Sequence, residues 1–167
     1  MSKPGLFFCI VALCTLAAGC NQHGSSTDSS APTAPVAGPA KPAATADETT
    51  WGNYLAEQGK LHGKDVGMRP YIYVIPAGDS VPAVSRRESE VDAVVHSIGP
   101  MLMPGGMLIV GGPDPKQTTT FITDVSKQLK EGSLKGVVVM VVSAPSEQAR
   151  TNDALKASGA TTRFVAM

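Results

Sequence analysis

The chain has 167 residues, enough for one ordinary domain with extensions, and 43% of them are hydrophobic against 17% charged. That balance is typical of a globular protein and excludes a chain that is disordered throughout. Its 14 basic residues equal its 14 acidic residues, so the chain lacks the basic field that binding to nucleic acid requires. We therefore expect no nucleic-acid partner.

The three cysteines, Cys9, Cys14 and Cys20, all lie near the N-terminus. The rest of the chain consequently has no disulfide, no thiolate nucleophile and no cysteine-based metal site. Beyond residue 50 only His62 and His96 remain, and they fall short of the ligands of a structural zinc site. Asp92 stands four residues before His96, which predicts a solvated pair on one helix face. We expect no metal and no cofactor.

The first twenty residues have the layout of an export signal. Lys3 supplies a positive start, and an apolar run from Leu6 to Ala18 is too short to span a bilayer comfortably. The run ends in Leu16-Ala17-Ala18-Gly19-Cys20. Small residues directly before a cysteine resemble the lipobox of bacterial lipoprotein precursors. The resemblance covers only this leader, and it departs from the commonest pattern by having Ala17 where leucine is usual.

The resemblance implies a lipid-anchored protein of the cell envelope. It implies a signal peptide over residues 1–19, diacylglycerol on the Cys20 sulfur, and fatty acylation, such as palmitate, of the new amino terminus. Two or three acyl chains make a firm membrane anchor. Asn21 follows the cysteine, and the absence of aspartate there implies the outer membrane, facing the periplasm. The alternative is an ordinary secretory signal that is cleaved nearby, with Cys20 incidental.

Residues 21–50 consist mostly of Ala, Pro, Ser, Thr and Gly and show no apolar periodicity. Such a segment cannot bury enough apolar surface to offset the entropy of ordering it. We therefore predict a disordered tether over residues 20–50, stiffened by its prolines, and a globular domain over residues 51–167.

From Trp51 onward, strand and helix signals alternate. A short helix is predicted over 50–60, and β-branched or aromatic runs predict strands at 71–75, 107–110, 137–142 and 162–166. Between them, helices are predicted from Ser85, which forms an S-x-x-E capping box with Glu88, from Asp114, and from Ser146 to Gly159. The run at 137–142 is continuously apolar, which is typical of a central parallel strand. We predict a small α/β three-layer sandwich with a mostly parallel four-stranded sheet in the order β-α-β-α-β-α-β.

Sites in such folds usually lie in the loops at the carboxyl ends of the strands, here 76–87, 111–116 and 143–146. The polar groups there that capping or helix faces do not explain are Asp79, Ser80, Arg86, Arg87 and Lys116. They are the candidate partner or ligand contacts, with Val81 or Pro82 as apolar neighbours and both arginines expected to be exposed. The turn at 111–116 precedes a helix N-terminus, where an anion site is an alternative to a simple cap.

No residues can be nominated as catalytic, because the strand-end loops contain no nucleophile motif and no base paired with a nucleophile. The favoured hypothesis is a non-catalytic domain that binds another envelope protein, as an accessory of an envelope machine or as an inhibitor or immunity protein. The alternative is a small-ligand-binding or hydrolytic domain that uses the same loops.

Overall fold

The structure is a computed structural model that describes residues 38–167. The predicted signal peptide, the predicted lipidation site at Cys20 and residues 21–37 of the predicted tether lie outside the described residues. Within the described part of the chain, no helix is long and apolar enough to span a membrane.

Helices and strands alternate along the chain. The main elements are α1 (Glu48–His62), β1 (Tyr71–Val74), α2 (Val81–Asp92), β2 (Met107–Gly111), α3 (Pro115–Gln128), β3 (Val138–Ser143), α4 (Gln148–Leu155) and β4 (Thr161–Ala166). A π-helical segment, Ala93–Ile98, and a 3-10 turn, Gly99–Met101, extend α2, while 3-10 turns Pro145–Glu147 and Lys156–Ser158 flank α4.

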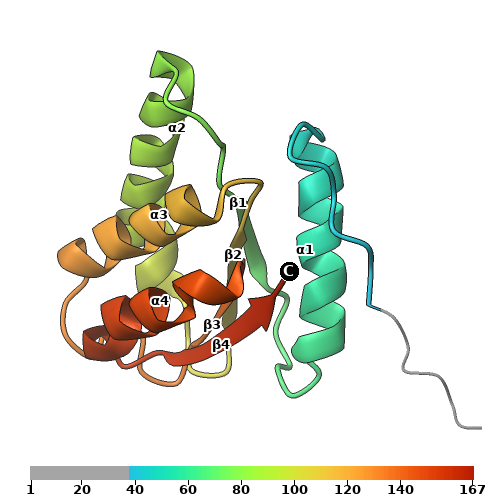
Figure 1. The fold of residues 1–167 in the computed structure, drawn as a ribbon. Coiled ribbons are helices and arrows are strands. Elements are labelled where there is room, and N and C mark those ends of the chain that lie inside the picture. The colour runs from blue at the N-terminus through green and yellow to red at the C-terminus, as the bar shows by residue number, and fades with distance from the viewer. Residues whose placement is uncertain (1–37) are drawn as a thin grey trace, which may run out of the picture. The chain divides into compact units, whose positions relative to one another are not determined.

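The four strands form one parallel sheet in the order β1-β2-β3-β4. Each crossover moves one strand further in the same direction, and parallel crossovers are right-handed, so their three helices must share one face. Figure 1 shows α2, α3 and α4 on one side of the sheet and α1 alone on the other. The predicted three-layer α/β fold with a four-stranded parallel sheet is confirmed.

Alternate residues of the strands build two separate cores. Val139 and Val141 of β3 belong to the core under α2, α3 and α4. Val138, Met140 and Val142 belong to the core under α1, together with Trp51 and Leu55. Every residue of β3 is buried, because helices cover both of its faces. The prediction of a central strand at this position is confirmed.

Two glycines at the end of β2 allow close packing rather than ligand approach. A side chain at Gly112 would stand 2.2 Å from the Ile75 carbonyl oxygen, and one at Gly111 would stand 2.7 Å from a methyl group of Leu55. The clash at Gly112 is with backbone atoms, which cannot move aside, so position 112 admits only glycine.

The starts of α2 and α4 differ from the predictions. α2 begins at Val81, capped by the Ser80 hydroxyl, which accepts from the Ala83 amide at 3.4 Å. Ser85 lies inside the helix, so the predicted Ser85–Glu88 capping box is wrong. The stronger start signal is a serine followed by a proline in the first turn, since proline has no amide to leave unsatisfied there. α4 follows a 3-10 turn that contains Ser146, and no side chain caps it.

The first helix begins before the expected boundary at Trp51. The Asp47 carboxylate accepts from the Thr50 amide at 2.7 Å and caps α1 at Glu48. The Trp51 indole donates to the Ala43 carbonyl oxygen at 3.2 Å, and Ala46 packs against the core under α1. The predicted boundary therefore falls inside α1, and residues just before it pack on the domain.

Candidate functional site

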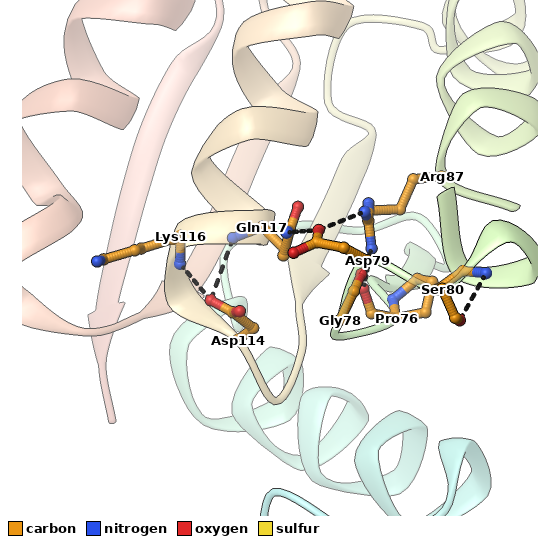
Figure 2. A network of polar contacts seen from close by, with 9 residues as sticks. Pro76, Gly78, Asp79, Ser80, Arg87, Asp114, Lys116 and Gln117 are labelled. Atoms are coloured by element: carbon orange, nitrogen blue, oxygen red, sulfur yellow. Dashed lines mark hydrogen bonds and ion pairs between the residues drawn. The ribbon is translucent and has the colours of Figure 1, made fainter. Parts of the chain in front are cut away.

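The loop between β1 and α2 is held by one arginine. The Arg87 guanidinium donates to the carbonyl oxygens of Pro76 at 3.0 Å and Gly78 at 2.6 Å, and it lies 3.5 Å from an Asp79 carboxylate oxygen. Gln117 of α3 donates to the same Asp79 oxygen at 2.9 Å. Figure 2 shows Asp79 between Arg87 and Gln117, so it joins the loop after β1 to the helix after β2.

Arg87 was expected to be exposed, and that expectation is wrong. Only 12% of its side chain is exposed, because its planar group lies over the loop and satisfies two carbonyl oxygens. Hydrogen bonds that involve a charged donor are stronger than neutral ones. Arg87 therefore fixes the loop that carries Asp79 and Ser80.

Arg86, its neighbour on α2, is turned towards α1. It makes a two-pronged contact with the Glu48 carboxylate, at 2.6 and 2.5 Å, and its Nε lies 3.7 Å from Glu90. The hydrogen bonds from Arg86 lower the pKa of Glu48 below its usual value. Arg86 is 44% exposed, but its charge is already matched. It takes no part in the network around Asp79.

The N-terminus of α3 already has an anionic partner. The Asp114 carboxylate accepts from the amides of Lys116 at 2.8 Å and Gln117 at 3.3 Å. Those are the donors that a bound anion would use, so the geometry favours the simple helix cap over the anion site. The Lys116 side chain points away from Asp79 and Asp114 (Figure 2).

The structure thus groups some of the candidate residues and separates others. Asp79 and Arg87 are in contact, and Ser80 is next to them as the cap of α2. Arg86 and Lys116 point in other directions from this group. Val81, the first residue of α2, is 79% exposed, the most exposed of the large hydrophobic residues in the described chain.

Sequence reasoning placed Ser143 in a strand-end loop but nominated neither Ser143 nor Glu147, which lie at the end of β3 and in the 3-10 turn after it. The Ser143 hydroxyl and one Glu147 carboxylate oxygen are buried and have no hydrogen-bond partner among the described residues. The nearest cation to Glu147 is Arg150, 4.0 Å away. A strand-end position was their only signal, since burial without a partner depends on the packing of α3 and α4.

The described residues contain no group of three or more His, Cys, Asp or Glu side chains able to hold a metal ion. The imidazole of His96 lies 2.9 Å from Asp92, with both side chains more than half exposed, which confirms the predicted solvated pair. Ser143 is fully buried, so a substrate cannot reach its hydroxyl in this conformation.

Comparison with known proteins adds no assignment. The chain matches no family model, and neither curated proteins nor solved structures gave a match.

Proposed function

We propose that the protein is a bacterial envelope lipoprotein, anchored through Cys20, whose α/β domain binds another envelope protein without catalysing a reaction. The lipid would hold the chain at the outer membrane, with the domain in the periplasm. The anchor rests on the leader sequence alone, and the binding role rests on the strand-end surface.

The exposure of Val81 is the observation that supports binding most strongly. A buried apolar residue at the centre of an interface, surrounded by a polar rim, is the usual arrangement of protein-binding surfaces. Val81 lies directly after Asp79 and Ser80 and before Pro82, which is also exposed. Covering Val81 with a partner would remove this apolar surface from water.

The rigidity of the neighbouring loop also favours binding over catalysis. Asp79 and Arg87 contact each other, and Gln117 donates to Asp79. Groups that satisfy one another in this way are poor general bases, but they hold a surface in shape before a partner arrives. Preorganisation of this kind improves affinity because less ordering is needed on binding.

Site-specific cross-linking in cells tests the binding role. A photoreactive side chain at Val81 should capture a specific envelope protein, and the exchange Val81→Asp should weaken that partner's binding. Met103, 63% exposed in the turn before β2, is the matched control at the other end of the strands. Equal capture at Val81 and Met103 contradicts the proposed surface. Turnover of a small substrate by the purified chain contradicts the non-catalytic role.

The anchor needs a separate test, because binding does not depend on it. The wild-type chain should incorporate a labelled fatty acid in a bacterial host and fractionate with membranes. Cys20→Ala should abolish both properties, whereas Cys14→Ala should abolish neither. Absence of label in the wild-type chain would leave the ordinary secretory signal as the better explanation.

A further inference from the structure

The outer edge of β4 presents unpaired backbone groups. The Thr161 amide donates to the carbonyl oxygen of Val137, the residue before β3, at 2.8 Å. The Met167 amide donates to the carbonyl oxygen of Ser143, the last residue of β3, at 3.1 Å. Backbone groups alternate in direction along a strand, so Thr162, Phe164 and Ala166 point their amides and carbonyls away from the sheet. None of these outward groups has a hydrogen-bond partner among the described residues.

This edge lacks the usual protection against strand pairing. Natural edges are guarded by proline, by inward-pointing charge, by a bulge or by a covering segment. β4 contains no proline, and its pairing with β3 runs without interruption over all six residues. Its one charged residue, Arg163, lies on the α1 face and makes a two-pronged ion pair with Asp65, at 2.8 Å for both bonds. Among the described residues no hydrogen bond closes this outer edge, and its one charge is matched.

We propose that β4 pairs in antiparallel register with β4 of a second copy of this chain. The two copies would be related by a twofold axis perpendicular to the sheet, so that two four-stranded sheets join into one. Such an isologous contact uses the same surface twice and closes the assembly at two copies. A second copy suits this edge because it offers an equally long set of unpaired groups with the same neutral charge.

The alternation of the strand selects one register. Residues opposite each other in an antiparallel pair must face the same side of the sheet. An axis through Phe164 meets this condition and pairs all three outward residues, with Thr162 opposite Ala166 and Phe164 opposite itself. An axis through Arg163 pairs only two of the outward residues, and it sets the Arg163 side chains of the two copies opposite each other, which is unfavourable. The axis through Phe164 instead places Arg163 beside Val165.

The helix next to this edge allows the approach. α4 lies over β4 in Figure 1, and Arg150, Asp153 and Ala154 line the groove that it forms with α3. Helical spacing then turns Gln148 and Asn152 away from α3, towards the second copy. Both are exposed and uncharged, so these two positions bring no like charges together.

Cross-linking between two single-cysteine chains tests both the contact and its register. Changing Cys9, Cys14 and Cys20 to serine leaves the full chain without a thiol. One tagged version then receives Thr162→Cys and the other Ala166→Cys. Mixed chains should form a disulfide or react with a short bifunctional maleimide. Each version alone should not, because like positions would be roughly 13 Å apart along the strands.

The matched control is Tyr71→Cys, at an exposed position on the opposite edge of the sheet, which should not cross-link with itself. Cross-linking of Tyr71→Cys at the same rate as the mixed pair overturns the proposal. Equal cross-linking of the mixed and unmixed β4 versions overturns the register and with it the twofold pairing.

Sedimentation equilibrium of the cysteine-free full chain gives an independent answer. A dimer should be seen, and Thr162→Pro should raise its dissociation constant about tenfold or more, because an outward hydrogen bond is lost in each copy. That amide makes no bond to β3, so the sheet itself keeps its ladder. Ala166→Lys, at an exposed position, places charge on the same edge and should act alike. A chain that stays monomeric at roughly 100 μM, or a dimer that both changes leave intact, overturns the pairing.

Discussion

The two outer strands of the sheet, β1 and β4, expose their edges in different ways. In β1 the Ile75 amide donates to Gly111 of β2 at 2.8 Å, so only Ile72 and Val74 direct amides outward. Pro70 and Pro76, on either side of them, have no amide to offer. β4 offers three outward residues and has no proline near its ends.

Side chains also close the edge of β1. Arg87 donates a hydrogen bond to the Pro76 carbonyl oxygen. The ion pair between Arg86 and Glu48 joins α2 to α1. That pair lines the same groove as Ile72 and Val74, so an incoming strand would have to displace it. On β4 the corresponding ion pair, Arg163 with Asp65, lies on a face of the sheet rather than at its edge. In this molecule only the ion pair at β1 stands beside the outward backbone groups of its strand.

The largest expected effect comes from the strands that hold both edges in place. Val139→Asp puts a carboxylate into the core under α2, α3 and α4, where Val139 is 1% exposed. Burial of an unpaired charge costs several kcal/mol, comparable to the whole stability of a small domain. Circular dichroism should show an unfolded or strongly destabilised chain. Val139→Ile is the control, and a fully folded Val139→Asp protein would contradict the central-strand assignment.

The next effect separates the two edges. Arg87→Gln removes charged hydrogen bonds to two carbonyl oxygens and should cost about 1–3 kcal/mol of unfolding free energy. Hydrogen exchange of the Tyr73 and Ile75 amides in and after β1 should speed up, while that of the Arg163 and Val165 amides in β4 should stay unchanged. Equal acceleration at both edges would show that Arg87 supports the whole sheet rather than the β1 edge.

Acid should weaken the ion pairs beside both strands. The hydrogen bonds from Arg163 lower the pKa of Asp65 from its usual 3.8 to about 2, and those from Arg86 lower the pKa of Glu48. A lowered pKa in the folded state stabilises the protein above the unfolded pKa, and this contribution is lost as the pH falls towards the folded pKa. Thermal melts between pH 4 and 2 should therefore show that Asp65→Asn loses less stability on acidification than the wild-type chain does. An unchanged pH profile in that variant would show that the pair does not contribute.

The smallest effect is expected at Lys116. Its side chain points away from the polar network around Asp79 (Figure 2). Lys116→Ala should change the unfolding free energy by less than about 0.5 kcal/mol, and it is the matched control for Arg87→Gln. A larger loss would reveal a structural role for this lysine.

Much of the fold was predictable from local pattern, because strands and helices differ in apolar spacing. The continuous apolar run of β3 identified a strand covered on both faces, and the cap signal at Asp114 identified the start of α3. The helix starts were less predictable. Ser80 and Ser85 are both plausible caps, and the proline after Val81 decided between them only in hindsight.

The candidate site was predictable in place but not in detail. Asp79, Ser80 and Arg87 do lie together, because they belong to one connection that follows the carboxyl end of β1. Which of them are free was not predictable, because Arg87 is satisfied by carbonyl oxygens and Asp79 by Gln117, which the β2–α3 turn brings from elsewhere in the chain.

The sequence by itself determined the element types and the parallel sheet, since the apolar patterns that predict them lie within short stretches of the chain. Only the tertiary structure decided which charges are matched, which polar atoms are buried without a partner, and which edge is open. Those properties depend on contacts such as Arg86 with Glu48 and Arg163 with Asp65, between residues 38 and 98 positions apart. Local sequence pattern does not predict contacts between residues so far apart in the chain, because those contacts depend on how the layers pack.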